Sequence, residues 1–170
     1  RMNSAMTEDV APCYVSVDAK AKKMFVANYG SGRMNIFDLE ADGSIKKLFQ
    51  TQLHGGTGPN LERQETSHAH AALMHPSNDW LFVPDLGSDD VWIYRYERES
   101  TIFYGHERQF SLRTAEGAGP RHMDFHPNGR LIYVINELDN TITGYRWDNA
   151  TGTSEEVQTV STLPADFTEW

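Results

Sequence analysis

Three residues of the 170-residue chain carry side chains suited to acid–base chemistry on a carbonyl group: His70, Arg121 and Glu137. A free imidazole titrates at about pH 6.5, so a histidine can take a proton from water at neutral pH. A guanidinium can stabilise a developing oxyanion, or hold a carboxylate or phosphate through two parallel hydrogen bonds. A carboxylate can orient the imidazole or shuttle the proton. Together these groups could activate a water molecule and stabilise negative charge on a carbonyl oxygen.

A repeated pattern along the chain positions these side chains. It superimposes Phe25 on Phe82 and Tyr133, at offsets of 57 and 51 residues, and carries Asn28 onto Asp85 with the first of these offsets. Each repeat contains short runs rich in Val, Ile, Phe and Tyr, separated by Gly, Asn, Asp and Pro, which is typical of strands and tight turns. Four antiparallel strands in a repeat of roughly 50 residues indicate a β-propeller blade. The predicted fold is all-β, a propeller of four-stranded antiparallel blades.

The repeats predict where each blade lies. We expect blade 1 over about 11–66, blade 2 over about 67–115, blade 3 over about 118–163 and the start of another blade at 164–170. The innermost strands are predicted at 13–17, 70–75 and 121–126, and the outermost at 45–53, 107–112 and 155–162. Closed propellers contain about 4 to 8 blades. The remaining blades of a longer chain, or further copies of this one, are therefore expected to complete the ring.

The repeat brings the three candidate residues to one rim. His70 and Arg121 are one blade offset apart, so they start the innermost strands of adjacent blades, and Cys13 holds the same position in the first blade, where we expect a buried thiol. In an antiparallel hairpin the start of the first strand and the end of the second lie at the same end. Glu137, just past its second strand, should return to the rim where Arg121 begins. In the alternative interpretation His70 only packs at the channel mouth and Arg121 is a structural ion-pair partner of Glu137.

The first repeat spacing is six residues longer than the second, and the excess falls around residues 55–67. A longer loop here would border the same rim, so we expect substrate contacts from Asn60, Arg63, Glu65 and His68; the alternative is a solvated, hydrogen-bonded loop. His68 and His70 alternate along a strand and could share a metal. Only Glu65 lies nearby as a further ligand, so neither a metal nor a cofactor is predicted.

Composition excludes several classes of partner. Fifteen Lys and Arg against 24 Asp and Glu give a net charge of −9, which opposes binding to nucleic acid or to an anionic membrane. The apolar runs are far shorter than the roughly 18 residues of a spanning helix. We see no signal peptide, and a single cysteine favours a reducing compartment. The expected location is the cytoplasm, and a small-molecule partner remains.

Several motifs resemble a known family. They are GPNLERQE at 58–65, SHAH at 67–70, VPDLGSD at 83–89, GPRH at 119–122 and NELDN at 136–140. Their pattern is similar to the lactonase family of seven-bladed β-propellers, which includes propeller-type 6-phosphogluconolactonases and fungal carboxy-cis,cis-muconate cyclases. The resemblance covers about residues 11–167 and implies that about three of seven blades are present.

The resemblance also implies a site and two reactions. The histidine, arginine and glutamate proposed for the muconate cyclase match His70, Arg121 and Glu137, whereas a further arginine of that site would lie beyond residue 170. The implied activity is hydrolysis of a sugar lactone of the 6-phosphogluconolactone type, or interconversion of a muconate and its lactone. The implied partner is therefore a small-molecule lactone or carboxylate. The alternative is a non-catalytic propeller that binds a small ligand or a protein partner.

Overall fold

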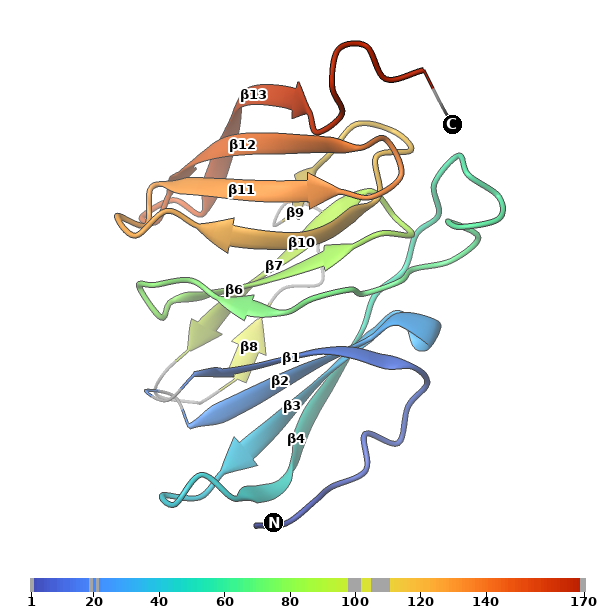
Figure 1. Ribbon diagram of the computed structural model, residues 1–170. Coiled ribbons are helices and arrows are strands. Elements are labelled where there is room, and N and C mark those ends of the chain that lie inside the picture. Colours follow the sequence, from blue (N-terminus) through green and yellow to red (C-terminus); the bar gives the residue numbers. More distant parts are fainter. Residues whose placement is uncertain (1, 19, 21, 98–101, 105–110, 169–170) are drawn as a thin grey trace.

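The computed structural model describes residues 2–18, 20, 22–97, 102–104 and 111–168, in which the chain forms three antiparallel sheets (Figure 1). The first sheet contains β1 (Pro12–Asp18), β2 (Lys23–Asn28), β3 (Arg33–Leu39) and β4 (Ile45–Leu53). The second contains β5 (Leu73–Met74), β6 (Trp80–Asp85), β7 (Asp90–Glu97) and β8 (Ile102–Tyr104), with β9 (Ser111–Arg113) also paired to β7. The third contains β10 (Pro120–Phe125), β11 (Leu131–Asn136), β12 (Thr141–Asp148) and β13 (Thr153–Ser161).

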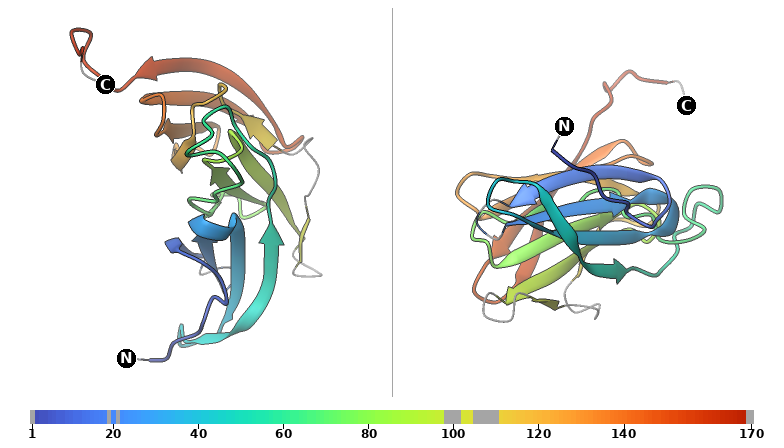
Figure 2. Two further views of the ribbon diagram at one scale, coloured as in Figure 1. Left: turned by 90° about the vertical axis from the view of Figure 1, so that its right-hand side faces the viewer. Right: turned by 90° about the horizontal axis from the view of Figure 1, so that it is seen from below.

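The sheets follow one another along a curved path, each facing the next (Figures 1 and 2). Apart from the 3₁₀ turn η1 (Tyr29–Ser31), the described residues contain no helix, and none that could cross a membrane. This is the arrangement of consecutive propeller blades, so the predicted all-β, partial-propeller fold is confirmed. The limits of the individual blades stay a prediction.

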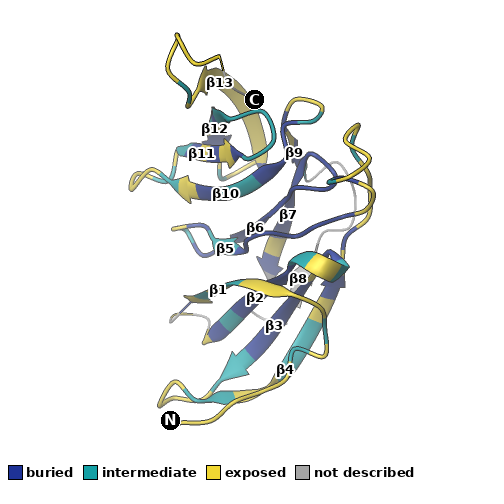
Figure 3. Cartoon of the chain, turned by 45° about the vertical axis from the view of Figure 1, so that its right-hand side comes forward, coloured by how far each residue is buried: buried dark blue, intermediate teal, exposed yellow. Residues whose placement is uncertain are grey.

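Two apolar layers hold the sheets together (Figure 3). Between the first and second sheets, Phe25 and Met34 pack with Leu81 and Tyr94. Between the second and third, one core cluster of buried side chains contains Trp80, Phe82, Val91, Ile93, Leu112, Met123, Ile132, Val134, Tyr145 and Trp147. Successive side chains along each strand point to opposite faces of its sheet, so one sheet can contribute to both apolar layers.

One strand prediction needs correction, and another lies partly outside the described residues. The predicted strand at 70–75 is reduced to β5 plus an isolated bridge between Ala69 and Asp85. Between these contacts with β6, the carbonyl of Ala72 accepts a 2.5 Å hydrogen bond from the Ser16 hydroxyl of the first sheet, so this stretch is bound to both neighbours. Of the strand predicted at 107–112, residues 107–110 lie outside the described residues, and the observed strand is β9.

A buried polar residue ends the second strand of each sheet: Asn28, Asp85 or Asn136. Asp85 makes the most contacts. It accepts hydrogen bonds from the His68 backbone amide at 2.6 Å, from the Gly87 amide at 3.0 Å, from the Trp92 indole at 3.2 Å and from the Ser67 hydroxyl. One carboxylate therefore fixes the segment that leads into His70.

Replacing Asp85 with alanine is expected to lower the free energy of unfolding by about 3 kcal/mol, because it leaves several buried donors without acceptors. Urea denaturation of the whole protein measures this. Asp42→Ala is the control: Asp42 lies in an exposed turn and accepts hydrogen bonds from Ser44, so the loss of stability should be far smaller. Equal losses in the two variants would contradict the role of Asp85.

Candidate active site at the sheet rim

Cys13, His70 and Arg121 occupy one backbone position in the three sheets. The pairing of β1 with β2 shifts register between Pro12 and Tyr14, and that of β10 with β11 shifts between Pro120 and His122, so Cys13 and Arg121 are bulge residues. His70 follows the Ala69 bridge in the same way and donates its backbone N–H to Pro84 at 2.9 Å. Bulges redirect side chains and often lie beside active sites. All three side chains thus start at the same rim.

A second repeated position supplies Tyr29, Leu86 and Glu137. Each is the first residue after a second strand, and its amide donates back to the segment before the first strand: to Ala11 at 3.0 Å, to His68 at 3.1 Å and to Gly119 at 2.9 Å respectively. This return places Glu137 beside Arg121, as the repeat predicts. The Arg121 Nε lies 2.7 Å from the Glu137 Oε2.

Glu137 is held between two arginines. Arg63, from the long loop between β4 and β5, donates a hydrogen bond from Nη2 to the other carboxylate oxygen at 2.7 Å. The Arg121 Nε–H makes an ion pair with the carboxylate but no aligned hydrogen bond, and no hydrogen bond of its two terminal nitrogens is found among the described residues. The side chain of Arg121 remains 43% exposed, so those nitrogens can meet a ligand.

The arginines determine the charge of Glu137. Burial acts to raise its pKa, but the hydrogen bond from Arg63 and the positive charges of Arg63 and Arg121 outweigh burial, and the pKa of Glu137 falls below its usual value. The carboxylate is therefore ionised at neutral pH. The same contact, with a second hydrogen bond to Tyr29, raises the pKa of Arg63 and keeps it charged.

His70 is buried in a group of rings and lies close to the thiol of Cys13. Its ring meets Tyr29 edge-on at 5.5 Å and His122 edge-on at 5.2 Å between centroids, and its Nδ1 is 3.9 Å from the Cys13 sulfur. Burial lowers the pKa of His70, and the charges of Arg121 and His122 lower it further against the opposing effect of Glu137. The imidazole is therefore neutral at neutral pH, the form that a general base requires.

Glu137 does not hold His70 as one interpretation expected. No hydrogen bond joins the two among the described residues, because both carboxylate oxygens face arginines. Glu137 acts on the imidazole through its charge. Cys13 also differs from expectation: the residue is exposed rather than buried, although packing around its sulfur raises the pKa of the thiol.

The loop residues predicted to contact substrate divide into two groups. Arg63 and His68 lie in the cluster: His68 stacks on Tyr29 at 4.4 Å and its Nε2 lies 3.1 Å from Glu65. Asn60 instead builds the loop, since its side-chain oxygen accepts from the amides of Glu62 and Arg63 at 3.1 and 3.2 Å. Their contacts with substrate stay predictions.

Sequence analysis missed Tyr29 and His122. Tyr29 contacts three members of the cluster, namely Arg63, His68 and His70. The same repeat that aligns His70 with Arg121 also aligns Tyr29 with Glu137, so the signal was present. His122 adjoins the bulge, where a histidine next to an arginine could have been noticed.

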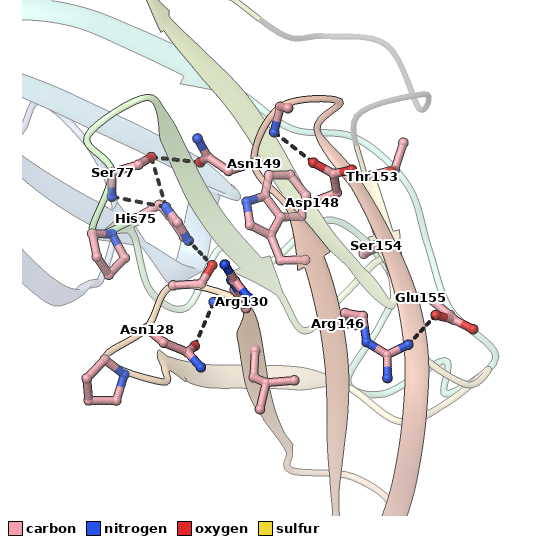
Figure 4. Close-up of a pocket in the computed structure, with 16 residues that line it drawn as sticks. His75, Ser77, Asn128, Arg130, Arg146, Asp148, Asn149, Thr153, Ser154 and Glu155 are labelled. Atoms are coloured by element: carbon pink, nitrogen blue, oxygen red, sulfur yellow. Dashed lines mark hydrogen bonds and ion pairs between the residues drawn. The ribbon is translucent and has the colours of Figure 1, made fainter.

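A cavity of about 1070 Å³ lies at the opposite ends of the strands (Figure 4). It is lined by the turns after β5 and β10 and by the β12–β13 turn, including Ser77, Arg130 and Asn149, and contains no residue of the rim cluster. His75 belongs to its wall, and its ring nitrogens are hydrogen-bonded to the Ser77 hydroxyl and the Gly129 carbonyl, each at 2.9 Å. Among the described residues, no three His, Cys, Asp or Glu side chains are grouped to hold a metal ion.

The three sheets form a partial β-propeller, and its rim carries a candidate site made of a histidine, an arginine and a carboxylate. The family model "Lactonase, 7-bladed beta-propeller" matches residues 1–170, and the chain belongs to this family. The chain is 34% identical over 168 residues to the 6-phosphogluconolactonase of Bacillus subtilis, covering 99% of this chain and 46% of that protein. The chain spans about half the length of the curated relatives it matches.

Solved structures agree with this assignment. A protein from Lactobacillus plantarum superimposes with a TM-score of 0.83 at 34% identity, over 92% of this chain and 44% of that one. The Pseudomonas aeruginosa periplasmic gluconolactonase superimposes with a TM-score of 0.80 at 30% identity, also over 92% of this chain and 44% of that one. The seven-bladed lactonase family expected from the motifs is thus confirmed.

The charges around His70 give a directional test. Arg121→Met removes a positive charge and should raise the pKa of His70, whereas Glu137→Gln removes a negative charge and should lower it further. NMR titration of the imidazole carbon-bound protons measures both shifts, with exposed His126 as the internal reference. Shifts in the same direction in both variants would contradict the arrangement described.

Proposed function

We propose that the whole protein hydrolyses a sugar lactone at the rim formed by His70, Arg121 and Glu137. The observation that carries the proposal is a neutral imidazole beside a carboxylate held between two arginines, one of which keeps its terminal nitrogens open. The names of the relatives, 6-phosphogluconolactonase and gluconolactonase, support a lactone as the substrate class.

The groups suggest the following order of events. His70 takes a proton from a water molecule as its oxygen attacks the lactone carbonyl carbon, and the Arg121 guanidinium stabilises the resulting oxyanion. The ring C–O bond then breaks, and the imidazolium returns the proton to the departing alkoxide, which becomes a hydroxyl group. The charge of Glu137 favours the transient imidazolium and holds Arg121 in place. Arg63 offers a second cation for a phosphate or carboxylate of the substrate.

The activity assay also tests two alternative functions. Interconversion of a muconate and its lactone would use the same base to move a proton to or from carbon, and no contact in the cluster favours it over hydrolysis. A propeller that only binds a ligand would keep the cluster without turnover. The cytoplasmic location stays a proposal, since one similar solved structure is a periplasmic gluconolactonase.

We also propose that a further blade of the same longer chain covers the third sheet. Phe25 and Phe82 each pack against the following sheet, whereas Tyr133, at the equivalent position, is 42% exposed. The turns repeat this asymmetry: Asp18 bonds Asn78 and His75 bonds Gly129 of the next sheet, whereas His126 is exposed. The third sheet thus presents the same interface without its partner.

Activity of the whole protein on 6-phosphogluconolactone and glucono-lactone, corrected for uncatalysed hydrolysis, tests the site. His70→Gln and Arg121→Met should each lower kcat by about 100-fold or more, through loss of the base and of the oxyanion donor. His126→Gln, at the other rim, should leave kcat unchanged.

Unchanged kcat in both site variants would remove the site assignment. Turnover of carboxymuconolactone alone would favour the muconate reaction, and turnover of no lactone at all would favour the ligand-binding reading.

Blade completion gives a separate prediction. Tyr133→Lys should destabilise the whole protein by about 2 kcal/mol or more, because a charge would be buried beneath the next blade. Leu61→Lys, at a residue that is 83% exposed, is the control and should have little effect. If Tyr133→Lys and Leu61→Lys change the free energy of unfolding equally little in urea denaturation, no further blade covers this face of the third sheet.

A further inference from the structure

We propose that Gln64 and Asp89 form a positioning pair that fixes Arg63 beside Glu137. Neither side chain can touch a substrate, since Gln64 is fully buried and Asp89 is 2% exposed. Their effect on catalysis rests on the proposed function, but their effect on the charges of the rim does not.

Gln64 organises the loop that carries Arg63. Its side-chain nitrogen donates to the Leu86 carbonyl at 2.9 Å and to the Asp89 carboxylate at 2.7 Å. Its side-chain oxygen accepts from the Asn60 amide at 3.1 Å. The loop backbone lies close to the side-chain amide of Gln64, since a Cβ at Gly58 would lie 2.4 Å from the amide carbon. The three hydrogen bonds of the Gln64 side chain join it to backbone atoms or to Asp89, and none is made at the rim opening.

Asp89 joins that loop to the segment that leads into Arg121. Its carboxylate accepts from Gln64, from the Gly117 amide at 2.7 Å and from the Gly119 amide at 2.9 Å. The backbone turn at Asp89 has a φ of 58°, and the equivalent Gly32 and Asn140 have φ of 65° and 55°. The turn therefore forms without a carboxylate, and the carboxylate of Asp89 serves the two loops.

These contacts form a closed circuit around the site. Asp89 holds the Gly119 amide, and the Gly119 carbonyl accepts from the Glu137 amide at 2.9 Å. Glu137 in turn accepts from Arg63, the residue next to Gln64. Arg121 lies two residues beyond Gly119. One buried hydrogen bond between Gln64 and Asp89 thus joins the loop that carries Arg63 to the segment that precedes Arg121.

The charged and titratable groups that face Glu137 come from three elements: Arg63 from the loop, Arg121 and His122 from β10, and His70 from the segment before β5. Arginine side chains have many rotamers, and preorganisation of such groups makes electrostatic stabilisation effective. Loss of the Gln64–Asp89 bond should release Arg63 from Glu137 while leaving Arg121 attached through β10.

The test is Gln64→Met in the whole protein, a substitution of similar volume that removes all three hydrogen bonds. Carbon-detected NMR titration of the Glu137 carboxyl should show its pKa rising in Gln64→Met, and it should rise likewise in Arg63→Met, which removes the lowering effect of that side chain. The double variant Gln64→Met/Arg63→Met should give no larger rise than Arg63→Met alone, because residues that act through one contact are not additive. Asp89→Asn, which keeps the left-handed turn and one acceptor oxygen, should give a smaller rise than Gln64→Met.

Asn149→Ala is the matched control. Asn149 is hydrogen-bonded to Ser77 and Asp79 at the opposite rim, so its loss should lower stability without moving the pKa of Glu137. An unchanged Glu137 pKa in Gln64→Met, or an additive double variant, would overturn the positioning role.

Kinetics separates this proposal from the proposed function. If the parent protein turns over a lactone, kcat/KM should fall roughly tenfold in Gln64→Met, with no further fall in the double variant relative to Arg63→Met. If the parent turns over no lactone, the proposed function fails, while the NMR titration still decides whether Gln64 positions Arg63.

Discussion

The structure depends on the antiparallel register of the first two strands in each sheet. Because these strands run in opposite directions, the residue that starts the first and the residue that follows the second meet at one rim. A bulge at the start of the first strand then turns one side chain, Cys13 or Arg121, out of the regular ladder. Repetition of this hairpin along a curved path brings residues 51 or more positions apart in the sequence into one cluster.

Electrostatic interactions set the protonation states of the side chains in that cluster. A single carboxylate, Glu137, is surrounded by two arginines, so it remains ionised despite partial burial. His70 sits at the edge of this network in a buried position, where desolvation favours its neutral form. The same few side chains thus keep the acid charged and the base uncharged. A simple ion pair between Arg121 and Glu137 would explain their contact, but it would not account for Arg63, which reaches the carboxylate from a loop preceding the second sheet.

Much of this was accessible from the sequence, because a propeller repeats one local pattern. The offsets of 57 and 51 residues predicted the three sheets, the shared position of His70 and Arg121, and the return of Glu137 to their rim. The extra residues of the first spacing indicated the loop that supplies Arg63. What the offsets do not encode is contact between unlike elements. Three such features depend on packing between neighbouring sheets. Glu137 binds Arg63 rather than His70, the Ser16 hydroxyl donates to the Ala72 carbonyl, and Cys13 is exposed.

The repeat also explains how one backbone position can carry different chemistry. At the bulge the three sheets present a thiol, an imidazole and a guanidinium on the same local backbone, so side-chain identity alone differentiates them. The hairpin turns show the same principle in Gly32, Asp89 and Asn140, which share a left-handed conformation. Glycine and asparagine suffice for that conformation. A buried carboxylate is costly without partners, and the one at Asp89 has three donors, all on segments that lead to the two arginines. Departure from the repeat at a buried turn therefore marks the place where the scaffold has been adapted to the site, a criterion that applies equally to any further blades of the chain.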